Sequence, residues 1–167
     1  MGDIPILGQQ LRDFFAGFTC QPAESPVERR NTETLRLLYQ RFNENELASG
    51  TRLLTADYEG LDVPSGEVVR GRDGWRTRQE ANRGPLPDAT TELMAVSVKG
   101  DLAVAEVVNR GTHTRPFPLP DGSMLPPTGR KIEALSCEIY EFRDGLIARG
   151  RLYYDFLTVA RQLGLFP

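Results

Sequence analysis

His113 and Asp155 are the two residues whose types and positions in the sequence suit acid–base catalysis. His113 is the only histidine among 167 residues, and it falls near the end of a strand-like run, just before a proline-rich loop. Imidazole titrates near neutral pH and can take or give a proton, although a histidine at the end of a strand is commonly just exposed to solvent. Asp155 follows the last strand-like run, where it serves equally well as the N-cap of a helix.

The face on which Asp155 lies decides between these two roles. Strand alternation predicts that Asp155 shares a face with Ile147, Arg149, Arg151 and Tyr153. If that face is the concave one, neighbouring aromatic surface desolvates the carboxyl group and raises its pKa towards that of a general base. Arg151 would lower the same pKa. By the same alternation, His113 shares a face with Asn109.

Several aromatic side chains are candidates for the wall of an apolar pocket that takes a flat ligand. They are Tyr39, Tyr58, Trp75, Tyr140 and Tyr153. Aromatic residues are more often part of the core than of a binding site, so both interpretations stay open.

Composition argues against several other classes of site. Two cysteines, Cys20 and Cys137, and a single histidine provide neither a disulfide framework nor a thiolate or histidine zinc site, so we expect no metal. A net charge of −3 argues against a nucleic-acid partner. There is no apolar run long enough for a membrane span, and the first residues lack the basic segment of a secretory signal. The expected location is therefore the cytoplasm.

The elements that must position these residues fall into two parts. Residues 1–30 form an arm, with apolar residues at helical spacing over 7–18 and a polar, proline-bearing linker over 21–30. The apolar stripe packs either on its own domain or on a partner subunit. The domain proper, residues 31–167, begins with a helix over about 31–48 whose apolar residues recur at i, i+3, i+4 and i+7.

The rest of the domain changes from helical to strand-like spacing. A helical turn over 51–56, an extended piece over 57–63 and a helix over 75–82, capped by Asp73, come first. After residue 88 the period is two, and we predict strands over 91–98, 102–114, 131–143 and 146–154. The dipeptides Gly100-Asp101 and Asp144-Gly145 predict tight turns, residues 116–129 form a proline-rich loop, and Gly164 ends a last helix over 156–163.

This order predicts an α+β fold with a small-molecule site. Helices that precede a meander of antiparallel strands and a short terminal helix are typical of the α+β class. A curled antiparallel sheet with helices on one face leaves a concave interior, which is where a small ligand binds.

Five motifs together resemble one known family. They are Gly71-Arg72-Asp73-Gly74, Gly111-Thr112-His113, Pro126-Pro127-Thr128-Gly129-Arg130, Asp144-Gly145-Leu146-Ile147, and Tyr154-Asp155 with Gln162-Leu163-Gly164. Over about residues 31–165 the chain resembles the SnoaL-like polyketide cyclases, a group similar to nuclear transport factor 2 and ketosteroid isomerase. The resemblance implies a cone-shaped α+β barrel, in which a curved antiparallel sheet surrounds an apolar pocket.

The resemblance also implies a function and a set of site residues. Cyclases of this type close a ring by intramolecular aldol condensation, without metal or cofactor, and the implied general acid/base is Asp155, assisted by His113. The substrate-binding residues that we expect are Asn109, Trp75, Tyr153, Tyr58, Tyr39 and Arg151. At Tyr153 such cyclases can carry a histidine, which points to a different substrate.

Other functions stay open, because proteins of this fold family differ in what they do. Hydroxylases, epoxide hydrolases, isomerases and proteins that only bind a hydrophobic molecule are the alternatives. The expected partners are a small hydrophobic or aromatic carbonyl compound and further copies of the chain, as a homodimer or a larger homo-oligomer.

Overall fold

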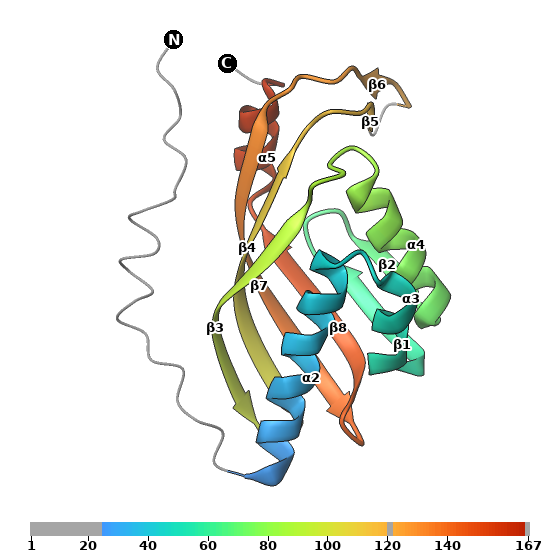
Figure 1. Ribbon diagram of the computed structural model, residues 1–167, viewed down its shortest axis with the longest axis vertical. Coiled ribbons are helices and arrows are strands. Elements are labelled where there is room, and N and C mark those ends of the chain that lie inside the picture. Colours follow the sequence, from blue (N-terminus) through green and yellow to red (C-terminus); the bar gives the residue numbers. More distant parts are fainter. Residues whose placement is uncertain (1–24, 120–121, 166–167) are drawn as a thin grey trace.

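A curved six-stranded sheet forms the body of the protein (Figure 1). The computed structural model describes residues 25–119 and 122–165, so the arm expected over residues 7–18 lies outside the described residues. The strand order across the sheet is β2 (Glu67–Arg70), β1 (Leu54–Asp62), β8 (Leu146–Tyr154), β7 (Lys131–Arg143), β4 (Leu102–Thr112) and β3 (Thr90–Lys99).

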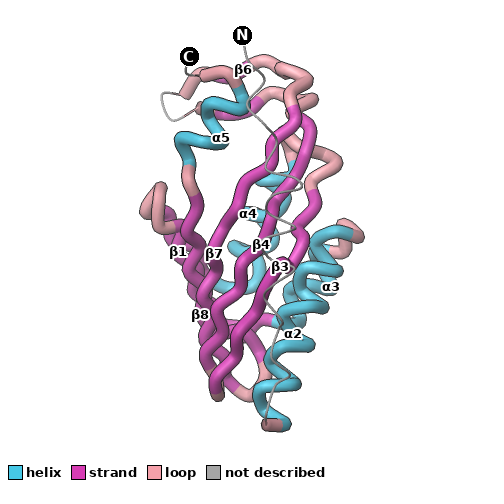
Figure 2. Tube along the Cα trace, turned by 90° about the vertical axis from the view of Figure 1, so that its left-hand side faces the viewer, coloured by secondary structure: helices cyan, strands magenta, loops and turns pink. Residues whose placement is uncertain are grey.

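The α+β class is confirmed, but two details of the sheet differ from the expectation. β1 and β8 run parallel, whereas every other neighbouring pair is antiparallel. The sheet also does not close into a barrel, because β2 and β3 are its two edges and neither bonds to the other. Figure 2 shows the long strands side by side, with α2 beside β3.

The first helix of the described chain starts earlier and ends sooner than the sequence predicts. Helix α2 (Pro26–Asn43) begins in the expected linker, because Ser25 and Glu28 form a reciprocal capping box in front of a proline. It ends before residue 48, because Asn45 adopts a left-handed φ of +58°. A separate short helix, α3 (Leu47–Gly50), follows.

The segment between α3 and β3 also differs from the prediction. Only Thr51–Leu53 forms a helical turn, and β1 starts directly after it. Strand β2 was not predicted. Helix α4 (Gly71–Arg83) starts four residues early, since Gly71 has a φ of +68° that lets the chain turn straight from β2 into the helix, with no side-chain cap.

The second half of the chain follows the prediction closely. The strands β3, β4, β7 and β8 match their predicted ranges within two residues at each end. Helix α5 (Phe156–Leu163) ends at Gly164 in the left-handed conformation, as predicted. Two short strands, β5 (Phe117–Pro118) and β6 (Met124–Leu125), pair within the loop.

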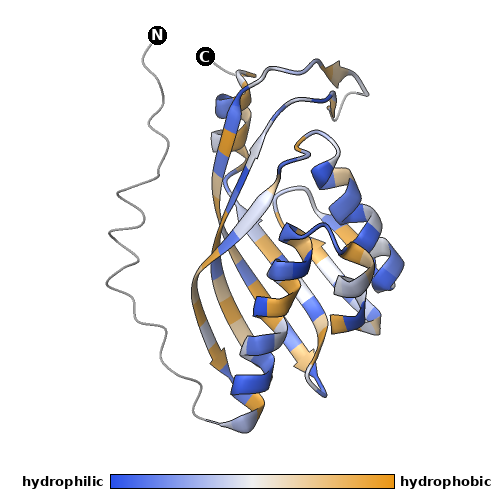
Figure 3. Cartoon of the chain, in the orientation of Figure 1, coloured by the Kyte–Doolittle hydropathy of each residue, from blue (hydrophilic) through white to orange (hydrophobic). Residues whose placement is uncertain are grey.

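Helices α2, α3 and α4 cover the inner face of the sheet. Apolar and polar residues alternate along much of the sheet (Figure 3), and the long strands turn a largely apolar row inward. The main core cluster joins the helices to the sheet, and its fully buried side chains include Leu35, Leu54, Val107 and Ile147. No helix of the described residues is long and apolar enough to cross a membrane.

The terminal helix completes the sheet where β8 ends. Strand β7 is longer than β8, and at Glu133 its edge has no neighbouring strand. The side-chain amide of Gln162 in α5 takes that place: it accepts from the Glu133 N–H at 3.0 Å and donates to the Glu133 carbonyl at 2.9 Å. Leu163 packs beside it on Ile132 and Ala134, which fixes α5 against the end of β7.

Candidate active site

An open groove of about 470 Å³ lies between α2 and the edge strand β3. Residues 91–96 of β3 form one wall, and Arg36, Tyr39, Gln40 and Asn43 of α2 form most of the other. The pairing of β3 with β4 slips between Leu93 and Ala95, which leaves Met94 as an extra residue in this wall. The groove therefore combines an apolar wall with polar groups.

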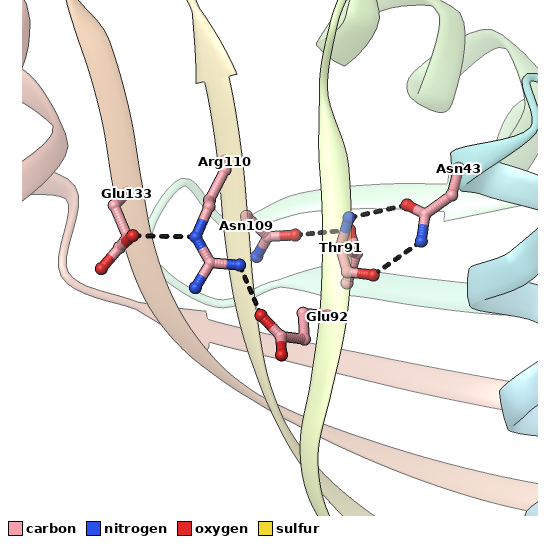
Figure 4. A network of polar contacts seen from close by, with 6 residues as sticks. All are labelled: Asn43, Thr91, Glu92, Asn109, Arg110 and Glu133. Atoms are coloured by element: carbon pink, nitrogen blue, oxygen red, sulfur yellow. Dashed lines mark hydrogen bonds and ion pairs between the residues drawn. The ribbon is translucent and has the colours of Figure 1, made fainter. Parts of the chain in front are cut away.

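A line of polar side chains runs from this groove across the inner face of the sheet (Figure 4). The Asn43 side chain accepts from the Thr91 N–H at 2.7 Å and donates to the Thr91 carbonyl at 2.9 Å. The Thr91 hydroxyl donates to Asn109 Oδ1 at 2.7 Å, and Asn109 donates to the Ser136 hydroxyl at 3.0 Å. The Ser136 hydroxyl oxygen is thus the last acceptor in this line. Its own hydrogen has no acceptor within the described residues.

Figure 4 also shows a charged cluster beside this line. Arg110 donates to Glu133 at 2.8 Å and to Glu92 at 2.6 Å. Alternation along β4 puts Arg110 on the opposite, outer face of the sheet from Asn109. The ion pairs of Arg110 therefore brace the outer face of the sheet, and of these three residues only Glu92 also lines the groove.

Glu138 lies two positions after Ser136 on the inner face of β7. The sequence analysis did not identify this carboxyl group as a site residue. Oε2 of Glu138 accepts from the hydroxyl of Tyr39, 99 residues away, at 2.9 Å, and also from the hydroxyl of Tyr140. Burial raises the pKa of Glu138, although the two hydrogen bonds work against the rise. Burial and the charge of Glu138 raise the pKa values of both tyrosines well above their usual range.

A third tyrosine faces the same place across two glycines. Gly60 and Gly150 lie opposite each other in the β1–β8 pair. A Cβ atom on either glycine would come within 2.7 Å of the Tyr58 hydroxyl, so the two glycines leave the room that this hydroxyl occupies. Burial, and then the charge of Glu138, raise the pKa of Tyr58.

Asp155 is an exposed helix cap. Its carboxylate accepts from the N–H groups of Leu157 and Thr158 and from the Thr158 hydroxyl, at 2.9, 3.2 and 2.6 Å. These hydrogen bonds lower the pKa of Asp155. Desolvation therefore does not prepare it as a base, and of the two roles weighed from the sequence, the structure displays the cap.

His113 is fully buried and holds the proline-rich loop. Its Nδ1 lies 3.0 Å from the Thr128 hydroxyl and accepts from the Thr128 N–H at 3.3 Å. In a neutral ring the proton then sits on Nε2, which has no hydrogen-bond partner in the described residues. The backbone of His113 also pairs with Gly129 and Arg130.

The structure keeps Asp155 and His113 apart. Tyr154, next to Asp155, lies opposite Ser136 of β7, whereas Thr112, next to His113, lies opposite Lys131. These two positions are five residues apart along β7, about 17 Å of extended strand.

Three further predicted site residues belong to other parts of the molecule. Tyr153 is 41% exposed, and Arg151 pairs with Glu141 across the outer face. The expected common face fails because the β7–β8 register slips between Glu141 and Phe142, which turns Ile147 inward while Arg151 points outward. Trp75 is buried in the main core beside Gly50.

The comparisons with known proteins agree with this architecture. A family model of SnoaL-like polyketide cyclases matches residues 32–163. The chain belongs to the SnoaL-like polyketide cyclase family. No curated sequence matches closely enough to count as a relative.

Solved structures of several other proteins share the fold of this family member. IdmH from Streptomyces antibioticus is 30% identical, with a TM-score of 0.70 over 80% of this chain and 98% of its own. TsrD from Streptomyces laurentii is 25% identical, with a TM-score of 0.70 over 82% and 96%. A SnoaL-like protein from Jannaschia sp. CCS1 superposes with a TM-score of 0.76 over 87% and 99%, at 21% identity.

Within this SnoaL-like fold, the structure brings together Tyr39, Tyr58 and Asn109 of the predicted site residues. It adds Glu138 and Ser136 to them. One signal was available in the sequence: at period two, the inward positions of β7 read Ile132, Ala134, Ser136, Glu138, Tyr140 and Phe142. A carboxyl group in such an apolar row is unusual. Among the described residues there is no group of three or more potential metal ligands.

Proposed function

We propose that the protein is a small-molecule enzyme that uses acid–base catalysis on a carbonyl compound and needs no cofactor. The reaction that we propose is the closure of a polyketide ring by an intramolecular aldol condensation. The observation that carries the proposal is the polar line from Asn43 to Ser136, which leads from an open groove to the inner face of the sheet. A largely apolar site with a few fixed polar groups is the usual form of a small-molecule site. IdmH, the 30% identical relative, is described as a proposed polyketide cyclase.

The chemistry is a rearrangement of bonds within one molecule. A base takes a proton from the carbon next to a carbonyl group, and the resulting enolate carbon attacks a second carbonyl carbon. A carbon–carbon bond forms, and the second carbonyl oxygen takes up a proton. Holding the two reacting carbons close together contributes a large share of the rate.

The first step of this reaction is measurable before the natural substrate is known. 2-Tetralone is a flat bicyclic ketone with acidic C–H groups beside the carbonyl. In D₂O, proton NMR follows the replacement of those hydrogens by deuterium. We expect the protein to accelerate this exchange well beyond the rate in buffer, and a rate equal to that in buffer would refute the proposed function.

A binding protein without catalysis is the second candidate. It is favoured by Asp155, the implied acid/base, whose carboxylate is engaged by the first turn of α5. Fluorescence of Trp75, the only tryptophan, reports binding of the ketone. Saturable binding with no deuterium exchange would favour this second function. If Asp155 is the base after all, Asp155→Asn abolishes exchange while the fold survives.

We also infer that copies of the chain associate through the outer face of the sheet. Val104, Leu135 and Tyr153 are each at least 37% exposed there, and apolar patches of this kind commonly mark interaction sites. Analytical ultracentrifugation tests this inference, and a monomer at high concentration would contradict it.

A further inference from the structure

We propose that Glu138 is the base that takes the proton from the carbon beside the substrate carbonyl, and that the Tyr58 hydroxyl receives the carbonyl oxygen. This inference rests on the proposed function and assigns its first step to particular atoms. It replaces Asp155 and His113, the pair that the family resemblance implies, in that step.

The two oxygens of Glu138 have different surroundings. Oε2 accepts from Tyr39 and Tyr140, which fixes the plane of the carboxyl group. Oε1 accepts no hydrogen bond from the residues that the structure describes. One oxygen therefore orients the group while the other keeps its lone pairs for a substrate proton.

Neither reacting oxygen is completely sealed from water. In the described part of the chain, four buried side-chain polar atoms are sealed from water without a partner: Asn31 Oδ1, Thr55 Oγ1, His113 Nε2 and Glu133 Oε1. Neither Glu138 Oε1 nor the Tyr58 hydroxyl is among them, and the Glu138 residue is only partly buried.

The Tyr58 hydroxyl is a free donor. Unlike the hydroxyls of Tyr39 and Tyr140, it donates to no acceptor within the described residues. It sits over Gly60 and Gly150, where any larger residue would push it aside. A donor that is fixed in place before the reaction stabilises the charge that develops on a carbonyl oxygen.

Tyr39 connects the groove to Glu138. Tyr39 lines the groove with its side chain and bonds Glu138 with its hydroxyl. The Ser136 hydroxyl, whose hydrogen is unused, shares the inner face of β7 with Glu138.

The step balances without any further reactant. The substrate C–H bond breaks, its proton forms an O–H bond with Glu138 Oε1, and its electron pair becomes the carbon–carbon double bond of the enolate. The enolate oxygen carries the negative charge and accepts from Tyr58. When the carbon–carbon bond has formed, Glu138 returns the proton to the new alkoxide. Burial suits Glu138 to this, since a carboxyl group with a raised pKa is a stronger base.

The test compares matched variants in the exchange of 2-tetralone in D₂O. Glu138→Gln keeps the shape and one oxygen that can accept from both tyrosines, but it removes the base, so we expect a loss of at least roughly 100-fold. Tyr58→Phe removes only the donor, and we expect a loss of roughly 100-fold. Glu141→Gln is the control, because it makes the same change on the outer face of the same strand; its rate should equal that of the wild type.

The results of these measurements distinguish a failure of the Glu138 assignment from a failure of the proposed function. Exchange at the wild-type rate in Glu138→Gln would overturn the inference and leave the proposed function standing. If the wild-type protein does not accelerate exchange at all, both fail together. Should Glu138→Gln not fold, judged by thermal unfolding, Glu138→Asp takes its place: a carboxylate one methylene shorter should retain part of the activity, and full activity would overturn the assignment.

Discussion

Replacing Gly150 by alanine tests the packing around the Tyr58 hydroxyl directly. The new Cβ would lie 2.7 Å from that hydroxyl oxygen and 3.3 Å from Tyr140 Cε1. The Gly150 backbone does not need a positive φ, so the clash with the hydroxyl is the main cost. Overpacking costs roughly 1 to 3 kcal/mol, and the loss of glycine flexibility in the unfolded chain returns roughly 0.4 to 1 kcal/mol. We therefore expect a net destabilisation of about 1 to 2 kcal/mol.

A double-mutant cycle shows whether the hydroxyl is the cause. In a Tyr58→Phe background the 2.7 Å contact no longer exists, so Gly150→Ala should cost markedly less, with a coupling of about 1 kcal/mol. Urea unfolding followed by Trp75 fluorescence measures all four proteins. Gly74→Ala is the control, since its Cβ would meet nothing closer than 3.4 Å and alanine favours a helix. Effects that add within about 0.5 kcal/mol would refute the packing argument.

Two further predictions concern how the ends of the described chain are held. Glu28 accepts from Gly100 and Ser25, and these hydrogen bonds lower its pKa from 4.5 to about 2. The stabilising effect of the ionised Glu28 is therefore present above pH 4.5 and is lost as the pH falls towards 2. Glu28→Gln should lower Tm at pH 7 and make Tm depend less on pH in the acid range. A variant whose curve of Tm against pH equals that of the wild type would contradict this prediction. Gln162→Ala should cost roughly 1 to 3 kcal/mol, because it leaves the N–H and carbonyl of Glu133 unpaired. Hydrogen exchange should then become faster at the Glu133 amide, and unchanged protection there would argue against the bridging role of Gln162.

The elements with strong local signals are those that the sequence predicts well. Asp144 and Gly145 both adopt positive φ, as the tight turn between β7 and β8 requires, and period-two alternation sets the ranges of both strands. Asp155 and Gly164 cap the two ends of α5 as the sequence indicates. These features were predictable because each depends on a few neighbouring residues and on backbone preferences that hold in any fold.

The start of α2 and the short strand β2 were not predicted. The capping box at Ser25 lies in a polar, proline-bearing stretch that is equally typical of a linker, so the local pattern is ambiguous. Strand β2 has four residues, too few for a period to be recognised.

The candidate site depended on the tertiary structure. By itself, the sequence determined the α+β class, the family, the long strands, and the presence of a single histidine and five tyrosines. It did not determine which face Arg151 and Tyr153 take, because a register slip near Glu141 reverses the parity that alternation predicts. It also did not single out Glu138, whose environment is made by Tyr39, 99 residues away in the chain, and by burial under the helices. Local patterns decide which elements form, whereas the contacts between distant elements decide which side chain is left buried, held in place and free to react.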